Sequence, residues 1–153
     1  MKEIIAYEMQ YSGDDVIYTD IVLISFQKKY YSEYELIYNE CFYEMRKALD
    51  VEPYNFYSDF GQLKNKMKDI FLYIKDEIIV GSVACYGNEI DDLVVNREYQ
   101  NHGIGQKLLL WAINHIRTYS YSPIVIHVAK WNEKALYIYE RNGFVITKTE
   151  KVR

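Results

Sequence analysis

The sequence predicts an α/β fold with an α+β layout, in which a mixed, mostly antiparallel central sheet is flanked by helices. Residues 70–95 read as three strands joined by the turns Asp76–Glu77 and Gly87–Asn88, which is typical of an antiparallel meander. Residues 89–150 then alternate strand and helix, which predicts a mixed sheet covered by helices. The chain has 153 residues, of which 50% are hydrophobic. This suffices for a core, so we expect a single domain over residues 1–153.

Strands are expected where apolar and β-branched residues run between turn signals. The turn Ser12–Asp15 separates the first two, and Pro123 precedes a later one. The expected strands cover residues 3–9, 16–26, 70–75, 78–86, 89–95, 124–129 and 144–150.

Two helices are expected before the meander. Ser32 with Glu35 three positions later has the capping-box pattern, and apolar residues then recur at every fourth position. This predicts a helix over 33–49 whose apolar stripe is Ile37, Cys41, Met45 and Leu49. A shorter helix is expected over 59–68, with Ser58 as its N-cap.

Two more helices are expected in the second half. The first opens at Gly103 and carries an apolar face wide enough to cover a sheet. Asn132 suits the N-cap of a helix over 133–141, and Asn142–Gly143 suits a left-handed C-terminal cap.

Cysteine and histidine spacing exclude several classes of site. Cys41 and Cys85 form no CxxC pattern, which fits two reduced core residues better than a disulfide framework. His102, His115 and His127 lack the short spacing of zinc ligands, so no metal is expected.

Composition and charge bound the partners. No apolar run is long enough to span a bilayer, residues 1–8 do not resemble a signal peptide, and no basic footprint for nucleic acid is present. We therefore expect a cytoplasmic protein with neither membrane nor nucleic acid as partner. The net charge is -4, yet residues 1–60 carry 12 acidic and 5 basic side chains. This uneven charge has two interpretations. Either the charged side chains form solvated faces of one fold, or the N-terminal part binds a cationic ligand and the C-terminal part an anionic one.

Residues 93–108 are the most informative stretch. A strand runs into a loop in which Gly103 and Gly105 stand where a helix begins, so backbone N–H groups are free to approach an anion such as a pyrophosphate. The Rossmann fingerprint fits poorly because its third glycine is missing, and no Walker loop is present. The other interpretation is an ordinary strand-to-helix turn.

Two motifs resemble those of one family. Gln100–Gly105 is similar to the R/Q-x-x-G-x-G/A motif of the GNAT superfamily of N-acetyltransferases, and Leu93–Val95 stands where that family's central strand ends. Asn132–Phe144 resembles its second signature, N-x-x-A-x-x-x-Y-x-x-x-G-F. The resemblance covers residues 70–150 well and 1–60 by layout only. It implies a GNAT-like acyl-CoA N-acyltransferase fold that transfers an acetyl group from acetyl-CoA to a primary amine.

The resemblance also implies which residues hold acetyl-CoA. The loop amides and their neighbours would bind the pyrophosphate, the end of the central strand would pair with the pantetheine arm, and the following helix would add an asparagine and a tyrosine. Gln100 stands where the family more often has Arg. The implied residues are Leu93, Val94, Val95, Gln100, Asn101, His102, Gly103, Ile104, Gly105, Gln106, Lys107, Asn132 and Tyr139.

Acyl transfer to an amine needs a neutral amine and a proton for the departing thiolate. By the resemblance, Tyr139 is that proton donor; the alternative is that it only packs its helix on the sheet. By the resemblance, Glu89 stands where histone-type members of the superfamily have a glutamate as base, and Asp91 is a second candidate. Strand alternation would place both on one face with Asp92 on the other. The alternatives are that these carboxylates only attract a cationic acceptor or form a solvated strand end. Ordered water is the other candidate base. A relay through Cys41 or Cys85 is disfavoured.

Several alternatives stay open. The chain is expected to be an enzyme whose acceptor amine is cationic and is either a small molecule or a peptide or protein amine. A non-catalytic acyl-CoA sensor or partner-binding module is the main alternative, and a nucleotide-binding regulatory domain is the third. The acceptor's identity, a preference for longer acyl chains and the oligomeric state, with a homodimer among its alternatives, are not fixed by the sequence.

Overall fold

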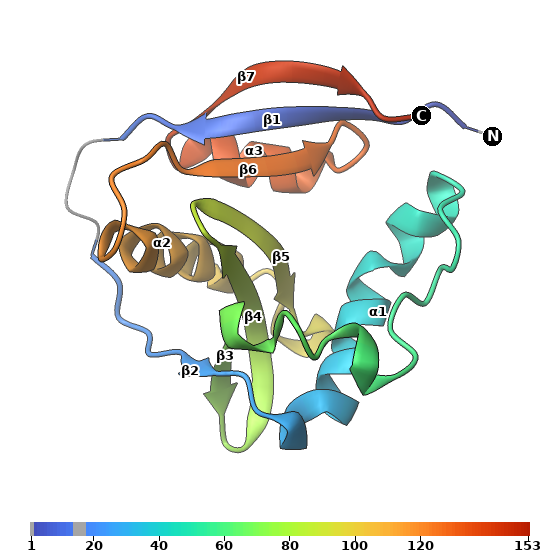
Figure 1. The fold of residues 1–153 in the computed structure, drawn as a ribbon, viewed down its shortest axis with the longest axis vertical. Coiled ribbons are helices and arrows are strands. Elements are labelled where there is room, and N and C mark those ends of the chain that lie inside the picture. The colour runs from blue at the N-terminus through green and yellow to red at the C-terminus, as the bar shows by residue number, and fades with distance from the viewer. Residues whose placement is uncertain (1, 14–17) are drawn as a thin grey trace.

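The described residues, 2–13 and 18–153 of a computed structural model, form one seven-stranded sheet in the order β2-β3-β4-β5-β6-β1-β7 (Figure 1). The strands are β1 (Ile5–Tyr11), β2 (Ile24–Ser25), β3 (Ile70–Lys75), β4 (Ile78–Tyr86), β5 (Glu89–Val95), β6 (Val125–Ala129) and β7 (Phe144–Lys151). The α-helices are α1 (Tyr31–Ala48), α2 (Ile104–Arg117) and α3 (Glu133–Arg141). This mixed sheet with flanking helices confirms the predicted fold class.

The sheet opens between β5 and β6. Every other strand pair is antiparallel, whereas β5 and β6 are parallel and pair only at Glu89 with Val125 and at Ile90 with Ile126. Beyond Ile90 the two strands diverge (Figure 1). The edge of β5 from Asp91 onward therefore lacks β6 as a hydrogen-bonding neighbour.

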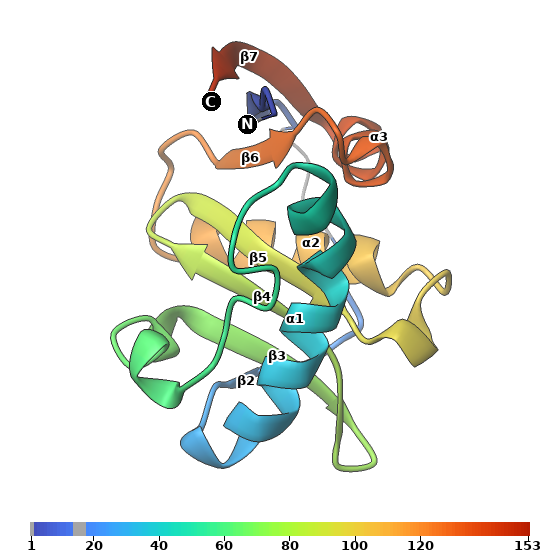
Figure 2. The same ribbon diagram turned by 90° about the vertical axis from the view of Figure 1, so that its right-hand side faces the viewer.

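The helices cover the two faces of the sheet around separate apolar cores. One core lies under α2 and α3 and includes Leu108 and Phe144, while the other lies under α1 and includes Tyr34 and Leu63 (Figure 2). In β3, Ile70 and the alternate residue Leu72 belong to the α1 core, as a period-two strand requires. No helix in the described ranges is long and apolar enough to cross a membrane.

The structure confirms several predicted helix and strand boundaries to within one residue. The meander occupies the three expected ranges, α2 begins after Gly103, and α3 covers 133–141 with Asn132 as its N-cap. The Asn132 side chain accepts a hydrogen bond from the Ala135 N–H at 3.3 Å. Gly143 adopts φ 93°, the left-handed conformation expected after this helix.

The predicted strand over 16–26 is wrong for its described part, which contains only the two-residue strand β2. Residues 14–17 of this prediction and of the turn before it lie outside the described residues. Ile21 and Leu23 are buried in the α2 core while Val22 is exposed, so the apolar alternation reflects packing beneath a helix and not pairing within the sheet. The first strand was also expected two residues too early, since β1 covers Ile5–Tyr11.

The predicted starts of the N-terminal helices are wrong as well. α1 begins at Tyr31, after a 3₁₀ turn, so Ser32 lies inside the helix and does not cap it. The expected helix over 59–68 is two short 3₁₀ turns, and Asp59 caps the first of them in place of Ser58. The capping box there joins Asp59 to Gln62, which closes a turn too short to propagate into an α-helix.

Candidate functional site

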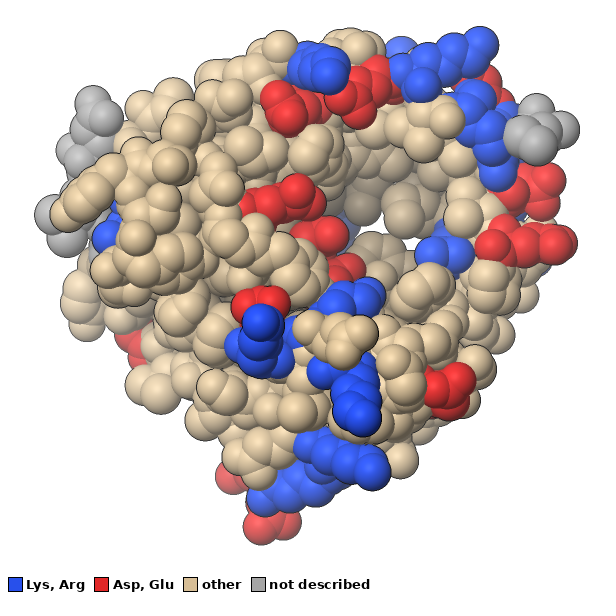
Figure 3. Space-filling model, viewed as in Figure 1, with Lys and Arg blue, Asp and Glu red and all other residues tan. Residues whose placement is uncertain are grey.

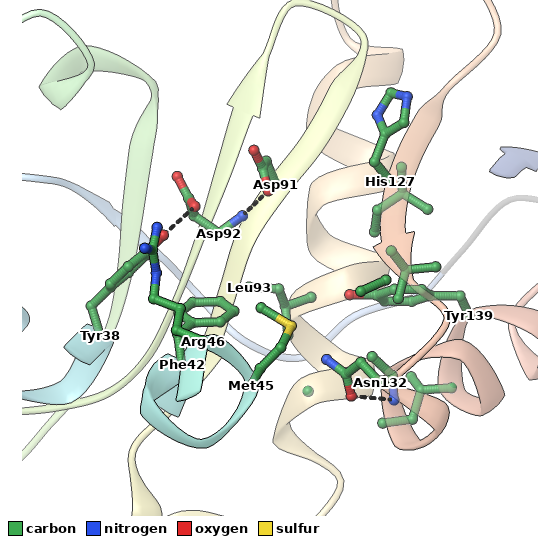
Figure 4. Close-up of a pocket in the computed structure, with 16 residues that line it drawn as sticks. Tyr38, Phe42, Met45, Arg46, Asp91, Asp92, Leu93, His127, Asn132 and Tyr139 are labelled. Carbon is green, nitrogen blue, oxygen red and sulfur yellow. Dashed lines mark hydrogen bonds between the residues drawn. The ribbon is translucent and has the colours of Figure 1, made fainter. Parts of the chain in front are cut away.

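A cleft of two adjoining chambers lies where β5 and β6 diverge. The loop chamber, of about 360 Å³, is bounded by β5, the segment 99–106 and α3. The inner chamber, of about 340 Å³, is bounded by β5, β6, α1 and α3 (Figure 4). Residues common to both chambers are Phe42, Met45, Leu93, Gly105, Asn132, Ala135 and Ile138. The two chambers therefore adjoin along these shared residues.

The loop chamber carries an anion site at the start of α2. Gly103 is the N-cap residue, adopts φ 78°, and offers no side chain to cap the helix. Asn101, another position with positive φ, helps to turn the loop. The first N–H groups of α2 are thus left for a ligand at the positive end of the helix dipole, which favours phosphate groups.

The backbone of β5 offers hydrogen-bonding groups to the cleft. The Asn96 N–H donates to Val80 of β4 and Val94 lies opposite Ser82, so by strand alternation Leu93 and Val95 direct their backbone groups to the edge that β6 leaves open.

The Val95 carbonyl on this edge is already engaged. It accepts hydrogen bonds from Cys41 Sγ at 3.2 Å and from Gln100 Nε2 at 3.1 Å. The amide of Gln100 thus fastens its own loop to β5. One of the two N–H donors of this amide is therefore used within the protein.

Two lysines flank the loop in different ways. Lys134 of α3 lines the loop chamber and its Nζ donates to Asn101 Oδ1 at 3.1 Å, a role that the sequence analysis missed. Lys107 instead forms an ion pair with Asp20 at 3.4 Å, and neither Lys107 nor His102 is among the residues that line the cleft. The positive charge in the chamber wall therefore comes from α3.

A β-bulge changes the expected order of the carboxylates. The register between β4 and β5 shifts by one residue between Ser82 and Ala84, and Asp92 adopts φ 49°. Asp91 and Asp92 consequently both line the inner chamber, so the predicted alternation, with Asp92 on the opposite face, is wrong. Glu89 is not among the residues lining either chamber.

The two aspartates are held differently. Asp92 accepts hydrogen bonds from the hydroxyls of Tyr38 at 3.0 Å and Tyr86 at 2.9 Å, one on each carboxylate oxygen. Asp91 accepts the Asp92 N–H at 2.7 Å on Oδ1. Asp91 nevertheless remains exposed, so solvent can reach its carboxylate.

Partial burial and the neighbouring Asp92 charge raise the pKa of Asp91 to about 6, with a smaller contribution from Glu89. Tyr139 lies across the chamber, and its hydroxyl points into the chamber (Figure 4). Burial and the charge of Asp91 raise the pKa of Tyr139 well above the ordinary value. Near neutral pH the chamber thus pairs a carboxylate that can accept a proton with a phenol that keeps its own.

Glu89 forms a pair with His127 of β6 and does not itself line the chamber. Its Oε2 is 3.6 Å from His127 Nδ1, while Glu8 Oε1 is 3.5 Å from His127 Nε2. His127 lines the inner chamber. The structure therefore brings Asp91 and Tyr139 together and places Glu89 one side chain away.

Helix α1 supplies one wall of the inner chamber with residues that the sequence analysis did not single out. Tyr38, Phe42 and Arg46 stand four residues apart, beside the apolar stripe that was recognised, and Met45 belongs to that stripe. The spacing was the available signal, because positions four residues apart share one helix face. Which of two neighbouring faces of α1 lines the cleft depends on how the helix packs against the sheet.

The acidic excess of the N-terminal part lies mostly outside the inner chamber. Glu35, Glu40 and Glu44 of α1 line a separate groove, and Glu44 also borders the loop chamber. From residues 1–60 the inner chamber receives the cation Arg46 and no carboxylate among its described lining residues. The molecular surface has a hollow that acidic atoms border on one side and basic atoms on the other (Figure 3).

The sequence model of the acetyltransferase (GNAT) family matches residues 31–144, which is most of the chain. The chain therefore belongs to the acetyltransferase (GNAT) family. No sequence among curated proteins matches the chain significantly.

Solved structures share the fold at low sequence identity. An acetyltransferase of the GNAT family from Colwellia psychrerythraea aligns with a TM-score of 0.69 at 13% identity, over 97% of this chain and 54% of that chain. A GCN5-related N-acetyltransferase from Sphaerobacter thermophilus aligns with a TM-score of 0.64 at 16% identity, over 100% and 53%. This chain thus spans about half the length of these two proteins.

The PaiA N-acetyltransferase from Thermoplasma acidophilum, solved in complex with coenzyme A, is closer in length. It aligns with a TM-score of 0.69 at 20% identity, over 86% of this chain and 94% of that chain. These likenesses show the GNAT acyltransferase fold.

Proposed function

We propose that this chain is an N-acetyltransferase that moves the acetyl group of acetyl-CoA to a primary amine by direct attack in a ternary complex. The observation that carries the proposal is the placement of Asp91 and Tyr139 in one chamber that adjoins the chamber with the anion site at Gly103. A proton acceptor, a proton donor and a phosphate site in one cleft are what this transfer requires.

The loop chamber fits coenzyme A by its donor groups. The open N–H groups at the start of α2 and the ammonium of Lys134 suit the pyrophosphate, while the backbone groups of Leu93 and the N–H of Val95 on the open edge suit the amides of the pantetheine arm. Asn132 lines both chambers and adds a polar group beside them. Acetyl-CoA supplies the thioester-bound acetyl group.

The inner chamber fits the proton transfers. Asp91 removes a proton from the ammonium of the acceptor, directly or through a water molecule, and the amine nitrogen then bonds to the acetyl carbon as the carbon–sulfur bond breaks. Tyr139 donates its phenolic proton to the departing sulfur, and the proton that the nitrogen loses on becoming an amide replaces it on Tyr139. Asp91 then releases its own proton to solvent. The Leu93 N–H polarises the acetyl carbonyl, because Leu93 lines both chambers and its backbone faces the open edge.

Direct transfer is favoured over a cysteine relay. Burial raises the pKa of Cys41 to about 11 and that of Cys85 to about 12, so both thiols stay protonated at neutral pH. A thiol needs its thiolate form to act as a nucleophile. The acceptor amine itself enters as an ammonium, which the Asp91 carboxylate attracts.

An assay of coenzyme A release tests this proposal. Purified protein is incubated with acetyl-CoA and a panel of primary amines, with calorimetry of acetyl-CoA binding in parallel. Binding with amine-dependent release of coenzyme A supports the enzyme. Binding without release on any amine identifies a non-catalytic sensor, and tight binding of ATP or NAD in place of coenzyme A identifies a nucleotide-binding domain.

A further inference from the structure

Arg46 is a cation fixed in the wall of the inner chamber. Its Nη1 donates to the carbonyl of Pro53 at 2.9 Å and to that of Val51 at 3.5 Å. The guanidinium carbon lies 4.8 Å from the centre of the Phe56 ring. Two carbonyls and one ring face thus hold the guanidinium, which is half-buried in the structure.

Arg46 keeps hydrogen-bonding capacity for a ligand. A guanidinium has five N–H donors, and the carbonyls of Val51 and Pro53 use those of Nη1. The donors on Nε and Nη2 have no hydrogen-bond partner within the described part of the chain. A planar pair of N–H donors matches the two oxygens of a carboxylate.

The surrounding charges define what Arg46 can recognise. Among the described residues that line the inner chamber, Arg46 is the one Lys or Arg side chain, and Asp91 and Asp92 are the carboxylates. Both oxygens of Asp92 are occupied by the hydroxyls of Tyr38 and Tyr86. The chamber therefore presents one guanidinium and, in Asp91, one carboxylate that is open to a ligand.

A guanidinium in a cleft that receives an ammonium repels it if the acceptor has no other charge. The same guanidinium becomes favourable when the acceptor also carries an anionic group, and it then rejects polyamines and plain alkylamines. The chamber volume of about 340 Å³ is in the range of small-molecule pockets.

We propose that the acceptor is a small zwitterion, whose primary amine is presented to Asp91 and whose carboxylate is held by Arg46. This inference rests on the proposed acetyltransferase function and names its substrate class. The competing explanation is that Arg46 only fastens the segment after α1 through Val51 and Pro53.

Matched acceptors separate the two explanations. Glycine, β-alanine, γ-aminobutyrate and 5-aminopentanoate are compared with n-alkylamines and diamines of the same chain length, and L-amino acids with their carboxamides. Rates are referred to the concentration of unprotonated amine. We expect the preferred carboxylate-bearing acceptor to exceed its matched neutral partner in kcat/KM by about 10- to 100-fold, the usual effect of a charge-assisted hydrogen bond.

The variants Arg46→Gln and Arg46→Lys test the residue itself. Arg46→Gln should remove most of the preference for the carboxylate over its carboxamide, and Arg46→Lys should restore only part of it, because an ammonium lacks the fork of donors. Arg97→Gln is the matched control, since Arg97 pairs with Glu40 at 2.8 Å outside the inner chamber. Calorimetry of the preferred amino acid with coenzyme A-loaded protein gives a readout that needs no turnover.

The outcomes separate this inference from the proposed function. If Arg46→Gln lowers both members of each pair equally, Arg46 only fastens the chain and the inference is overturned. It is also overturned if alkylamines or diamines are preferred, or if no amino acid binds the loaded protein, although acetyl transfer to other amines would leave the enzyme assignment intact. Failure of every amine to release coenzyme A counts against the proposed function itself.

Discussion

The hydroxyl of Tyr38 donates a 3.0 Å hydrogen bond to Asp92 Oδ1 and so ties helix α1 to the bulge of strand β5. Tyr86 occupies the other oxygen of Asp92 at 2.9 Å. In the adjacent residue Asp91, the second carboxylate oxygen accepts no hydrogen bond from the residues that the structure describes. Partial burial together with the Asp92 charge raises the pKa of Asp91 to about 6. Asp92 therefore has a structural role in the chamber wall, whereas Asp91 can still accept a proton.

Replacing Asp92 tests this relationship. Asp92→Asn removes the adjacent negative charge, and asparagine tolerates the left-handed backbone at φ 49°. We expect the pKa of Asp91 to fall, so that the acidic limb of the kcat/KM–pH profile moves to lower pH by about one pH unit.

Other charged or titratable groups near Asp91 also act on its pKa, so they are left unchanged in this comparison. Charged or titratable groups near Asp91 are Asp92, Glu89, Lys66, Arg46, His127, Tyr38, Tyr57, Tyr86 and Tyr139. Glu98→Gln, at an exposed site outside the cleft, is the control. An acidic limb that stays in place in Asp92→Asn would show that Asp92 does not influence the base.

Asp91→Asn should lower activity and raise stability at neutral pH. The pKa of Asp91 in the folded chain, about 6, is above its ordinary value of 3.8, so the folded state binds this proton more tightly than the unfolded state. The stability contributed by the proton is present below about pH 4 and is lost as pH rises to about 6.

Thermal unfolding at two pH values checks the sign. At pH 7 Asp91→Asn should have a higher Tm than wild type, and at pH 4 the difference should shrink toward zero. Its kcat/KM should fall by about 10²- to 10⁴-fold, the range for loss of a general base. The turn variant Asp76→Asn serves as the control. Equal Tm differences at both pH values would refute a raised pKa at Asp91.

Tyr139→Phe separates proton donation from packing. The change keeps the ring that packs in the α2 core and deletes only the hydroxyl. Because the phenol stays protonated at neutral pH, we expect kcat to fall by about 10²- to 10⁴-fold while the Kd of coenzyme A changes little. Tyr137→Phe, on the exposed side of the same helix, is the matched control. A kcat within a few-fold of wild type would return Tyr139 to a packing role.

Gly105 tests the approach of coenzyme A to β5. A Cβ atom there would lie 3.8 Å from Val95 and 3.9 Å from Leu93, which are ordinary contacts, so Gly105→Ala should fold and bind coenzyme A. Gly105→Leu extends into the cleft that this residue lines and should abolish coenzyme A binding in calorimetry while circular dichroism stays unchanged. Normal binding by a folded Gly105→Leu protein would exclude this part of the cleft as the coenzyme A site.

Local signals predicted the second half of the fold because a turn or capping residue marks the ends of its strands and helices. The turns Asp76–Glu77 and Gly87–Asn88 join the strands of the meander, and Gly103 and Asn132 are the N-cap residues of α2 and α3. The segment 18–23 has no comparable signal. Its alternation of buried and exposed residues arises from packing under α2, a contact between distant parts of the chain.

The site was predictable to the extent that it depends on motifs. The loop at Gly103 and the hydroxyl of Tyr139 lie on the expected elements, whereas the shared chamber of Asp91 and Asp92 depends on a one-residue register shift against β4. Strand alternation along one sequence cannot reveal such a bulge. The cation Arg46 was missed because only the packed sheet shows which face of α1 meets the cleft.

We propose that Asp91 and Tyr139 serve acetyl transfer to an amine within a ternary complex. The most direct measurement follows one reaction of the purified protein with acetyl-CoA and its preferred amine, by thiol detection of coenzyme A and by mass spectrometry of the acceptor. We expect equal amounts of free coenzyme A and of amine heavier by one acetyl group, with both products greatly reduced in Asp91→Asn and in Tyr139→Phe. Coenzyme A binding with no acetylated amine from the wild-type protein, across the whole amine and amino acid panel, would contradict it.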